Sequence, residues 1–166
     1  PVLMAAAAVM EYQVIISRGI DAQKAAVLTV GSVQADTDNN VIPGTALVKV
    51  NLRWYDEADR RIMLDGIERI NRSIAAAYAM PESRYPTTLR KGWSYPQRND
   101  PQMVAKLNPV LKRMLGDDKV WTIPPQMGSE DFHHLVLDNE KKQYHYIQVG
   151  TAKPEHFAKA QKEGKL

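Results

Sequence analysis

The apolar residues of the first hundred positions follow two kinds of spacing, one helical and one extended. Residues 2–18 carry apolar side chains three or four positions apart, which predicts a helix with one apolar face: Leu3, Ala6, Ala7, Met10 and Val14. Residues 46–54 alternate between apolar and polar side chains, which predicts a strand with one buried face. Residues 27–33 are rich in β-branched side chains and predict a second strand.

Further elements complete a mixed α+β pattern over residues 1–98. Asp56 is expected to cap a long helix that ends before Pro81 and has one apolar side: Met63, Ile67, Ile70, Ile74 and Ala77. Residues 84–98 contain two prolines, a glycine and several aromatic residues, which predicts an irregular edge strand. One more strand before Pro1 would complete the order βαββαβ, a ferredoxin-like unit.

The pattern changes at residue 99, where we place a domain boundary. Asp100 and Pro101 are typical of the N-cap and first position of a helix. This helix is expected to end at Gly116 and to turn four side chains inward: Val104, Leu107, Leu111 and Met114. A strand over 119–123, a helix capped by Ser129 and a strand over 144–149 are expected to follow. This αβαβ order predicts a parallel α/β layer for residues 99–166.

Composition and charge exclude several functional classes. The net charge of +3 arises from 22 basic and 19 acidic residues without a basic stripe, which argues against nucleic-acid binding. No apolar run approaches the roughly 20 residues of a membrane span, so no membrane association is expected. The chain has no cysteine, which excludes a disulfide framework and fits a cytoplasmic protein. Because it begins at Pro1, already in a helical pattern, and ends after a polar stretch, it is expected to be part of a longer protein.

Two polar side chains beside the predicted strands are candidates for ligand contacts. Asn40 precedes Val41-Ile42-Pro43 and either locks a turn by bonding nearby backbone or offers its carboxamide to a substrate carbonyl or carboxylate. Arg53 lies on the polar face of the 46–54 strand. It is either a solvated surface charge or a fork-shaped carboxylate binder.

The segment Met127-Gly128-Ser129-Glu130-Asp131-Phe132 is a third candidate. It indicates either an ordinary capped helix start with acidic residues in its first turn or a turn whose backbone N–H groups meet a ligand. The four histidines are scattered and predict no metal site: His133, His134, His145 and His156. His145 is expected to be a core residue of the 144–149 strand, and His156 to lie in a polar tail.

Three segments together resemble a known family. Asn39-Asn40-Val41-Ile42-Pro43, Leu52-Arg53-Trp54-Tyr55-Asp56 and Met127-Gly128-Ser129-Glu130-Asp131-Phe132 resemble motifs of the zinc-dependent aminoacylase, hippurate hydrolase and carboxypeptidase family. The likeness is to its bacterial amidohydrolase branch, which includes aminobenzoyl-glutamate hydrolases. This resemblance implies a ferredoxin-like lid, incomplete over residues 1–98, inserted in a zinc-peptidase-like catalytic domain whose C-terminal part is residues 99–166.

The resemblance also implies a function for the whole protein. It would hydrolyse the amide bond of an N-acyl amino acid or a related carboxylate-bearing substrate, using two divalent ions (zinc, or manganese or cobalt), and would dimerise through the lid. Substrate-binding residues carried over to this chain are Asn40, Arg53, Gly128, Ser129 and Glu130. The family's metal ligands and general base lie mostly before the lid, so the chain alone is expected to bind no metal and to be inactive. The alternative is a stand-alone ferredoxin-like module that dimerises or binds a small ligand without catalysis.

Overall fold

The computed structural model describes residues 1–36, 38–136 and 142–165. The described residues form two compact units. The first comprises residues 1–96 and 125–130, and the second comprises the remainder. The division differs in detail from a single boundary at residue 98, because the short segment 125–130 belongs to the first unit.

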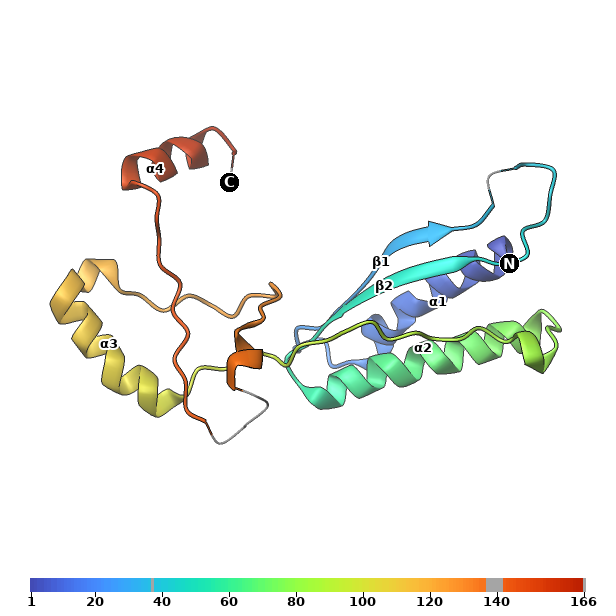
Figure 1. The fold of residues 1–166 in the computed structure, drawn as a ribbon, viewed down its shortest axis with the longest axis horizontal. Coiled ribbons are helices and arrows are strands. Elements are labelled where there is room, and N and C mark those ends of the chain that lie inside the picture. Colours follow the sequence, from blue (N-terminus) through green and yellow to red (C-terminus); the bar gives the residue numbers. More distant parts are fainter. Residues whose placement is uncertain (37, 137–141, 166) are drawn as a thin grey trace. The chain divides into compact units, whose positions relative to one another are not determined.

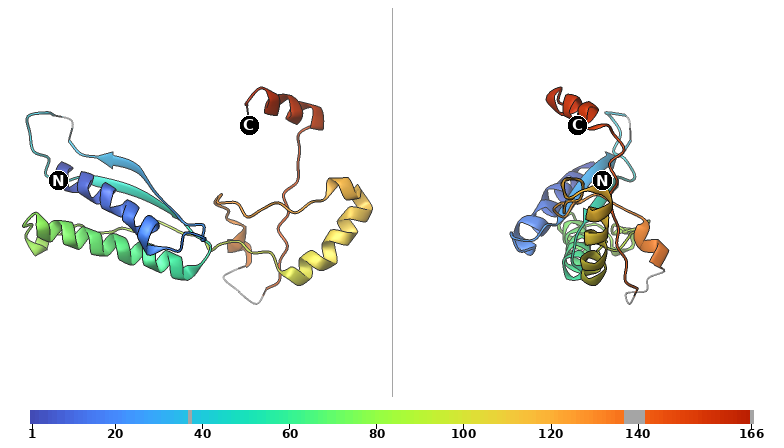
Figure 2. Two further views of the ribbon diagram at one scale, coloured as in Figure 1. Left: turned by 180° about the vertical axis from the view of Figure 1, so that it is seen from behind. Right: turned by 90° about the vertical axis from the view of Figure 1, so that its left-hand side faces the viewer.

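The first unit consists of two helices on a β-hairpin (Figure 1). Its elements follow the order α1 (Val2–Gly19), β1 (Val27–Gln34), β2 (Leu47–Arg53) and α2 (Glu57–Ala77). Both helices cover the same face of the two-stranded antiparallel sheet, with α1 packed against β1 and α2, and α2 packed against β2 (Figures 1 and 2). The predicted helix–strand–strand–helix order is therefore confirmed.

The strand register fixes which residues share an end of the hairpin. Val27 pairs with Arg53 at the open end, and Gln34 pairs with Leu47 beside the connecting loop. The pairing is irregular between Val30 and Ser32, where one extra residue on β1 is typical of a bulge. Along β2, half-buried and exposed side chains alternate as the sequence predicts.

The core lies between the sheet and the helices. Met63 of α2 is completely buried, and its neighbours in the core come from α1, β1, α2 and the connection between α1 and β1: Ala8, Tyr12, Ile15, Ile20, Leu28, Ile67 and Ile70. Gly66 allows α1 to approach α2 closely, because a Cβ at this position would lie 2.9 Å from Ile15 Cγ1. Inside the helix pair, Tyr12 donates a 2.5 Å hydrogen bond to Asn71 Oδ1.

The apolar face predicted for α1 is not the face that packs in the core. The buried side chains are Ala5, Ala8, Tyr12 and Ile15, which differ from the predicted stripe. Leu3, Met10 and Val14 are 65%, 72% and 45% exposed. The spacing alone could not separate these faces, since α1 is apolar around most of its circumference.

This composition also makes α1 long and apolar enough to cross a membrane by length and hydropathy alone. Core helices of soluble proteins have the same property, and one side of α1 lies in the core of the first unit.

The edge strand predicted over 84–98 is wrong. A short 3-10 turn, η1 (Glu82–Arg84), is followed by backbone that forms no strand up to residue 98. Two prolines remove backbone donors from this segment. Side chains hold it instead: Asn71 donates to Thr88 Oγ1 at 3.5 Å, and the Trp93 ring centroid lies 4.2 Å from the Arg60 guanidinium carbon.

The second unit contains α3 (Pro101–Leu115), η2 (Asp117–Lys119), η3 (Phe132–Val136) and α4 (Pro154–Lys162). Asp100 caps α3 as predicted, accepting a 2.9 Å hydrogen bond from the Met103 N–H. None of the described residues of this unit forms a strand, so the strands predicted over 119–123 and 144–149, and with them the parallel α/β layer, are not found.

The 144–149 segment is bonded instead by Asn99 and Asp100. The Asn99 carboxamide donates to the Tyr146 carbonyl at 2.9 Å and accepts from the Tyr146 N–H at 2.8 Å, as a neighbouring strand would. The Asp100 N–H also donates to the Tyr144 carbonyl at 3.0 Å, so the residues just before α3, and no strand among the described residues, bond this segment. His145 is half-buried, but Ile147 and Val149 beside it are exposed, so the predicted core strand face is also wrong.

The two remaining helical predictions for this unit need correction. Of the side chains expected to point inward from α3, none is buried, and Met114 is 74% exposed. The helix predicted after Ser129 is only the 3-10 turn η3, and the polar tail that contains His156 is helical in α4.

Candidate functional site

Arg53 and the Met127-Gly128-Ser129 turn, two separate candidates in the sequence, meet in the structure. Arg53 is the last residue of β2, and its Nη1 donates a hydrogen bond to the Met127 carbonyl, 74 residues further along the chain. Both residues belong to the first unit. The contact joins the end of the hairpin to the turn that carries Gly128, Ser129 and Glu130.

A second contact fixes the Arg53 guanidinium. Its Nε donates to Asn51 Oδ1 at 3.3 Å. Asn51 and Arg53 lie two residues apart on β2, so their side chains leave the same face of the sheet. Asn51 was not among the candidates, although the alternation along the strand placed it beside Arg53.

The turn itself is exposed and irregular. Met127 is half-buried, whereas Gly128, Ser129 and Glu130 are exposed. Among the described residues, Ser129 forms no capping hydrogen bond, and η3 begins three residues later at Phe132. The N-cap interpretation of Ser129 is therefore wrong, and the residue is open to solvent.

Phe132, the last residue of the same motif, lies in the second unit. Its ring packs against Tyr144 and Tyr146 at centroid distances of 5.6 and 5.3 Å. These contacts suit aromatic pairs, which prefer tilted geometry at 4.5–7 Å. The motif thus has an aromatic anchor in one unit and an exposed turn in the other.

Asn40 lies away from the other candidates. It is in the loop that joins β1 to β2, whereas Arg53 is at the opposite end of the hairpin. Seven strand residues separate these ends, roughly 20 Å at the usual rise. None of the hydrogen bonds between described residues involves the Asn40 carboxamide, which leaves the turn-lock interpretation without support in this part of the chain.

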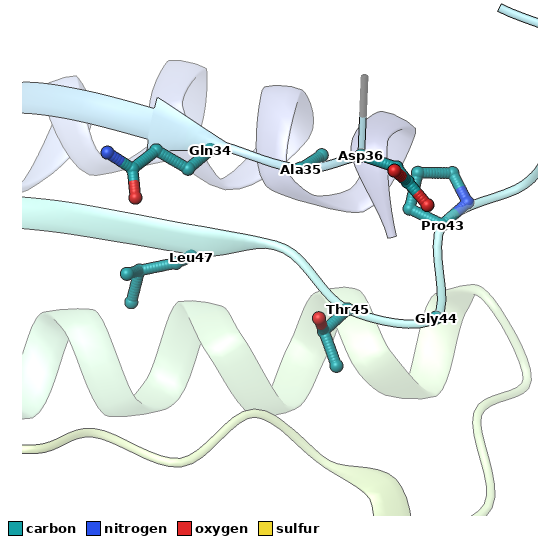
Figure 3. A pocket seen from close by; sticks show the side chains of 7 residues that line it. All are labelled: Gln34, Ala35, Asp36, Pro43, Gly44, Thr45 and Leu47. Atoms are coloured by element: carbon teal, nitrogen blue, oxygen red, sulfur yellow. The ribbon is translucent and has the colours of Figure 1, made fainter. Parts of the chain in front are cut away.

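A hollow of about 320 Å³ lies where this loop leaves and rejoins the hairpin (Figure 3). It is lined by Gln34, Ala35, Asp36, Pro43, Gly44, Thr45 and Leu47. Asn40 is not among its lining residues. The hollow is therefore a property of the base of the loop and is separate from the Arg53 site.

A cluster that was not predicted from the sequence lies just beyond Arg53. The Arg60 guanidinium carbon is 5.6 Å from the centroid of the Trp54 ring and 4.2 Å from that of Trp93, and Nη1 is 2.6 Å from Glu57 Oε1. Trp93 packs edge-on against Tyr95. Through the contact between Trp93 and Arg60, the cluster packs the segment before Pro96 against the start of α2. Trp54 belongs to the Leu52–Asp56 motif, whereas Trp93 and Tyr95 were indicated only by the aromatic content of residues 84–98.

The described residues offer no metal centre. Among the described side chains of residues 1–36, 38–136 and 142–165, which do not include that of His133, no group of three or more histidines, aspartates or glutamates could hold an ion. His134 and His156 are exposed. A metal ion does not fit the donor set of this part of the chain.

Comparison with known proteins identifies relatives. No model of a known protein family matches the chain. It is 32% identical over 140 residues to N-acetyldiaminopimelate deacetylase of Limosilactobacillus fermentum, an alignment that covers 81% of this chain and 34% of that protein. The deacetylase of the same name from Streptococcus uberis is 28% identical over 151 residues, covering 91% of this chain and 39% of that protein.

The chain is homologous to part of an amidohydrolase. The resemblance inferred from the three motifs is thereby confirmed. The chain spans about a third of the length of the curated relatives it matches.

The fold agrees with this relationship. A crystal structure from methicillin-resistant Staphylococcus aureus, provisionally described as that of an aminohydrolase, matches 82% of this chain and 34% of its own with a TM-score of 0.66. At 24% sequence identity this likeness concerns the fold alone.

Proposed function

We propose that this chain is part of a metal-dependent amidohydrolase that cleaves the amide bond of an N-acyl amino acid or a similar carboxylate-bearing substrate. The observation that carries the proposal is the similarity to N-acetyldiaminopimelate deacetylases over 81% of the chain. The name of these relatives describes removal of an acetyl group from an amino acid nitrogen, which is hydrolysis of an amide. We further propose that the protein acts in the cytoplasm on small molecules, with no nucleic-acid or membrane partner.

Within this enzyme, residues 1–98 would form an incomplete ferredoxin-like lid and residues 99–166 the C-terminal part of the catalytic domain. The α–β–β–α order of the first unit supports the lid. The exposed apolar side chains of α3 support the second assignment, because apolar helix faces are normally covered by other parts of a domain.

The lid and the turn would contact the substrate rather than carry out the chemistry. Arg53 offers a planar guanidinium suited to a carboxylate, and Gly128, Ser129 and Glu130 offer exposed polar groups beside it. Asn40, at the other end of the hairpin, would present its carboxamide to a different substrate group or to the site of a neighbouring subunit. No catalytic residue is assigned to this chain.

We propose that the enzyme uses two divalent ions, zinc or alternatively manganese or cobalt. The described residues do not supply the ligands. We propose that most of the ligands lie in the part of the protein that precedes the lid, as the resemblance to the family implies.

We also propose that the lid forms a homodimer. Two observations support a shared interface on one flank. Among the described residues, β1 pairs only with β2, so its outer edge is open. α1, which packs against β1, exposes Leu3, Met10 and Val14. A two-fold axis that pairs β1 with its copy would bring α1 beside its own copy, giving a self-complementary contact.

The rival function is a module that binds or dimerises without catalysis. Its experimental signature differs from that of the enzyme. The protein encoded by the complete reading frame that contains these residues is expected to release acetate from N-acetyl amino acids when it is loaded with zinc. It is expected to lose this activity when the zinc is removed by a chelator. A folded, dimeric product of that frame without hydrolytic activity on any N-acyl amino acid would favour the module.

A further inference from the structure

The hydrogen bond from Arg53 to the Met127 carbonyl indicates a structural role for Arg53 that its position on β2 did not indicate. The guanidinium is planar and carries five N–H donors in a fixed arrangement. Two of its nitrogens have protein partners: Nε bonds Asn51 Oδ1 and Nη1 bonds the Met127 carbonyl. Two bonds from one planar group fix both the direction of the side chain and the place of the carbonyl.

The backbone around the turn is irregular. Residues 120–130 contain no helix or strand, so the regular backbone hydrogen bonds of such elements do not hold them. Gly128 adds backbone freedom directly after the bonded carbonyl. The hydrogen bond from Arg53 of β2 to the Met127 carbonyl therefore restrains where Gly128 and Ser129 lie.

We propose that Arg53 is a positioning residue, which holds the Met127-Gly128-Ser129 turn through the Met127 carbonyl. The proposal rests on the proposed function only in taking this turn as part of a substrate-binding surface. Arg53 then acts on the substrate through the turn, in addition to any contact of its own. Loss of the guanidinium would release the turn without unfolding the hairpin, because Arg53 is exposed at the end of β2.

The sequence permits a measurement at this one peptide bond. The chain has seven methionines and nine glycines, and Met127-Gly128 is the only place where glycine follows methionine. A chain labelled with ¹³C at methionine carbonyls and ¹⁵N at glycines gives a single cross-peak in an HNCO spectrum. That peak reports the Met127 carbonyl carbon, whose resonance moves upfield when the carbonyl loses a hydrogen bond.

The variants to compare are Arg53→Met, Arg53→Lys and the matched control Arg61→Met. Arg61 is an exposed arginine of α2 whose Nε lies 3.9 Å from Glu57 Oε1. We expect an upfield shift in Arg53→Met, a smaller one in Arg53→Lys because the ammonium keeps one charged donor, and an unchanged peak in Arg61→Met.

An unchanged peak in Arg53→Met, with helical circular dichroism preserved, would overturn the proposal. If Arg53→Met does not fold, Arg53→Ala takes its place, and a peak identical to that of the unchanged chain counts against Arg53. Equal shifts in the Arg53 and Arg61 variants would also overturn it, since the effect would then be a general one of removing charge. None of these outcomes depends on enzymatic activity, so a failure here leaves the amidohydrolase proposal standing.

Discussion

Tyr12 and Asn71 form a hydrogen bond within the interface of α1 and α2, with 2.5 Å between Tyr12 Oη and Asn71 Oδ1. The two residues are 4% and 8% exposed. Asn71 also donates to Thr88 at 3.5 Å. Through these two hydrogen bonds, Asn71 links α1 and α2 to the segment after α2 that contains Thr88.

Tyr12→Phe should destabilise the first unit. The substitution leaves Asn71 Oδ1 buried without its donor, which costs about 1–3 kcal/mol. Urea denaturation followed by circular dichroism measures the change. Tyr78→Phe is the matched control, since Tyr78 is 42% exposed at the end of α2. Equal stabilities of the Tyr12 and Tyr78 variants would show that the buried bond adds nothing.

The same hydroxyl makes stability depend on alkaline pH. Burial raises the pKa of Tyr12. The folded state therefore favours the protonated phenol. Its contribution is complete below the unfolded value of about 10 and is lost as the pH rises through the higher folded pKa. Tyr12→Phe should flatten the fall of the melting temperature above about pH 10. A fall of unchanged slope would contradict this account.

Gly66→Ala tests the close packing of the helices. The new Cβ would lie within 3.2 Å of three Ile15 carbons, and Ile15 is buried. Overpacking costs about 1–3 kcal/mol, which exceeds the gain in helix propensity of about 1 kcal/mol. We expect a net loss of about 1 kcal/mol in chemical denaturation. Gly19→Ala is the control, because its Cβ would meet Ile62 at an ordinary 3.5 Å. Greater stability of Gly66→Ala than of the unchanged chain would refute the steric argument.

Lys24 provides a second test of pH dependence. Its ammonium lies 2.9 Å from the buried carboxylate of Asp59, and this hydrogen bond raises the pKa of Lys24. A raised lysine pKa gives stability that is complete below the unfolded value of about 10.4 and disappears as the pH rises through the folded one. Lys24→Met should therefore lower the melting temperature at neutral pH, with a difference that shrinks above about pH 10.5. Lys49→Met, on the exposed side of β2, should change it little at either pH. A difference that persists at high pH would assign the effect of Lys24 to packing.

Met10→Lys tests the dimer. Met10 is 72% exposed at the centre of the apolar stripe of α1 and is not part of the core. The substitution should therefore leave the stability of the monomer unchanged. A charge at the middle of a self-complementary contact faces its own copy. We expect sedimentation velocity to show a dimer for the unchanged chain and a monomer for Met10→Lys. Gln13→Lys, a change on the neighbouring exposed surface, is the control. A monomer for the unchanged chain would contradict the proposed interface.

The sequence predicted the elements whose packing is local. The alternation along β2 and the spacing along α2 each predicted one apolar face. The structure half-buries that face of β2 and buries Met63, Ile67 and Ile70 of α2, whereas Ala77, predicted on the same side, is exposed. The prediction for α1 was wrong, because a helix that is apolar on two sides gives no signal for which side meets the core. It was also wrong for 144–149, which forms no strand although Asn99 and Asp100 bond its backbone at Tyr146 and Tyr144. An apolar pattern does not show whether a partner strand is present.

Which of the candidate residues lie together could not be predicted from the sequence. The motifs identified Arg53 and Gly128-Ser129, and the structure joins them through the Met127 carbonyl. Their contact spans 74 residues, a separation over which local spacing carries no information. The same motifs placed Asn40 with them, whereas the hairpin register puts it at the opposite end.

Hydrolysis by the complete protein tests the central claim most directly. The product of the complete reading frame that encodes these residues is purified, loaded with zinc, and assayed for acetate release from N-acetyl amino acids, including N-acetyldiaminopimelate. The 166-residue chain alone is assayed in parallel. We predict release by the complete product that is lost on chelation and restored by zinc, manganese or cobalt, and no release by the chain alone. A folded, metal-loaded complete product that hydrolyses none of these substrates would contradict the account.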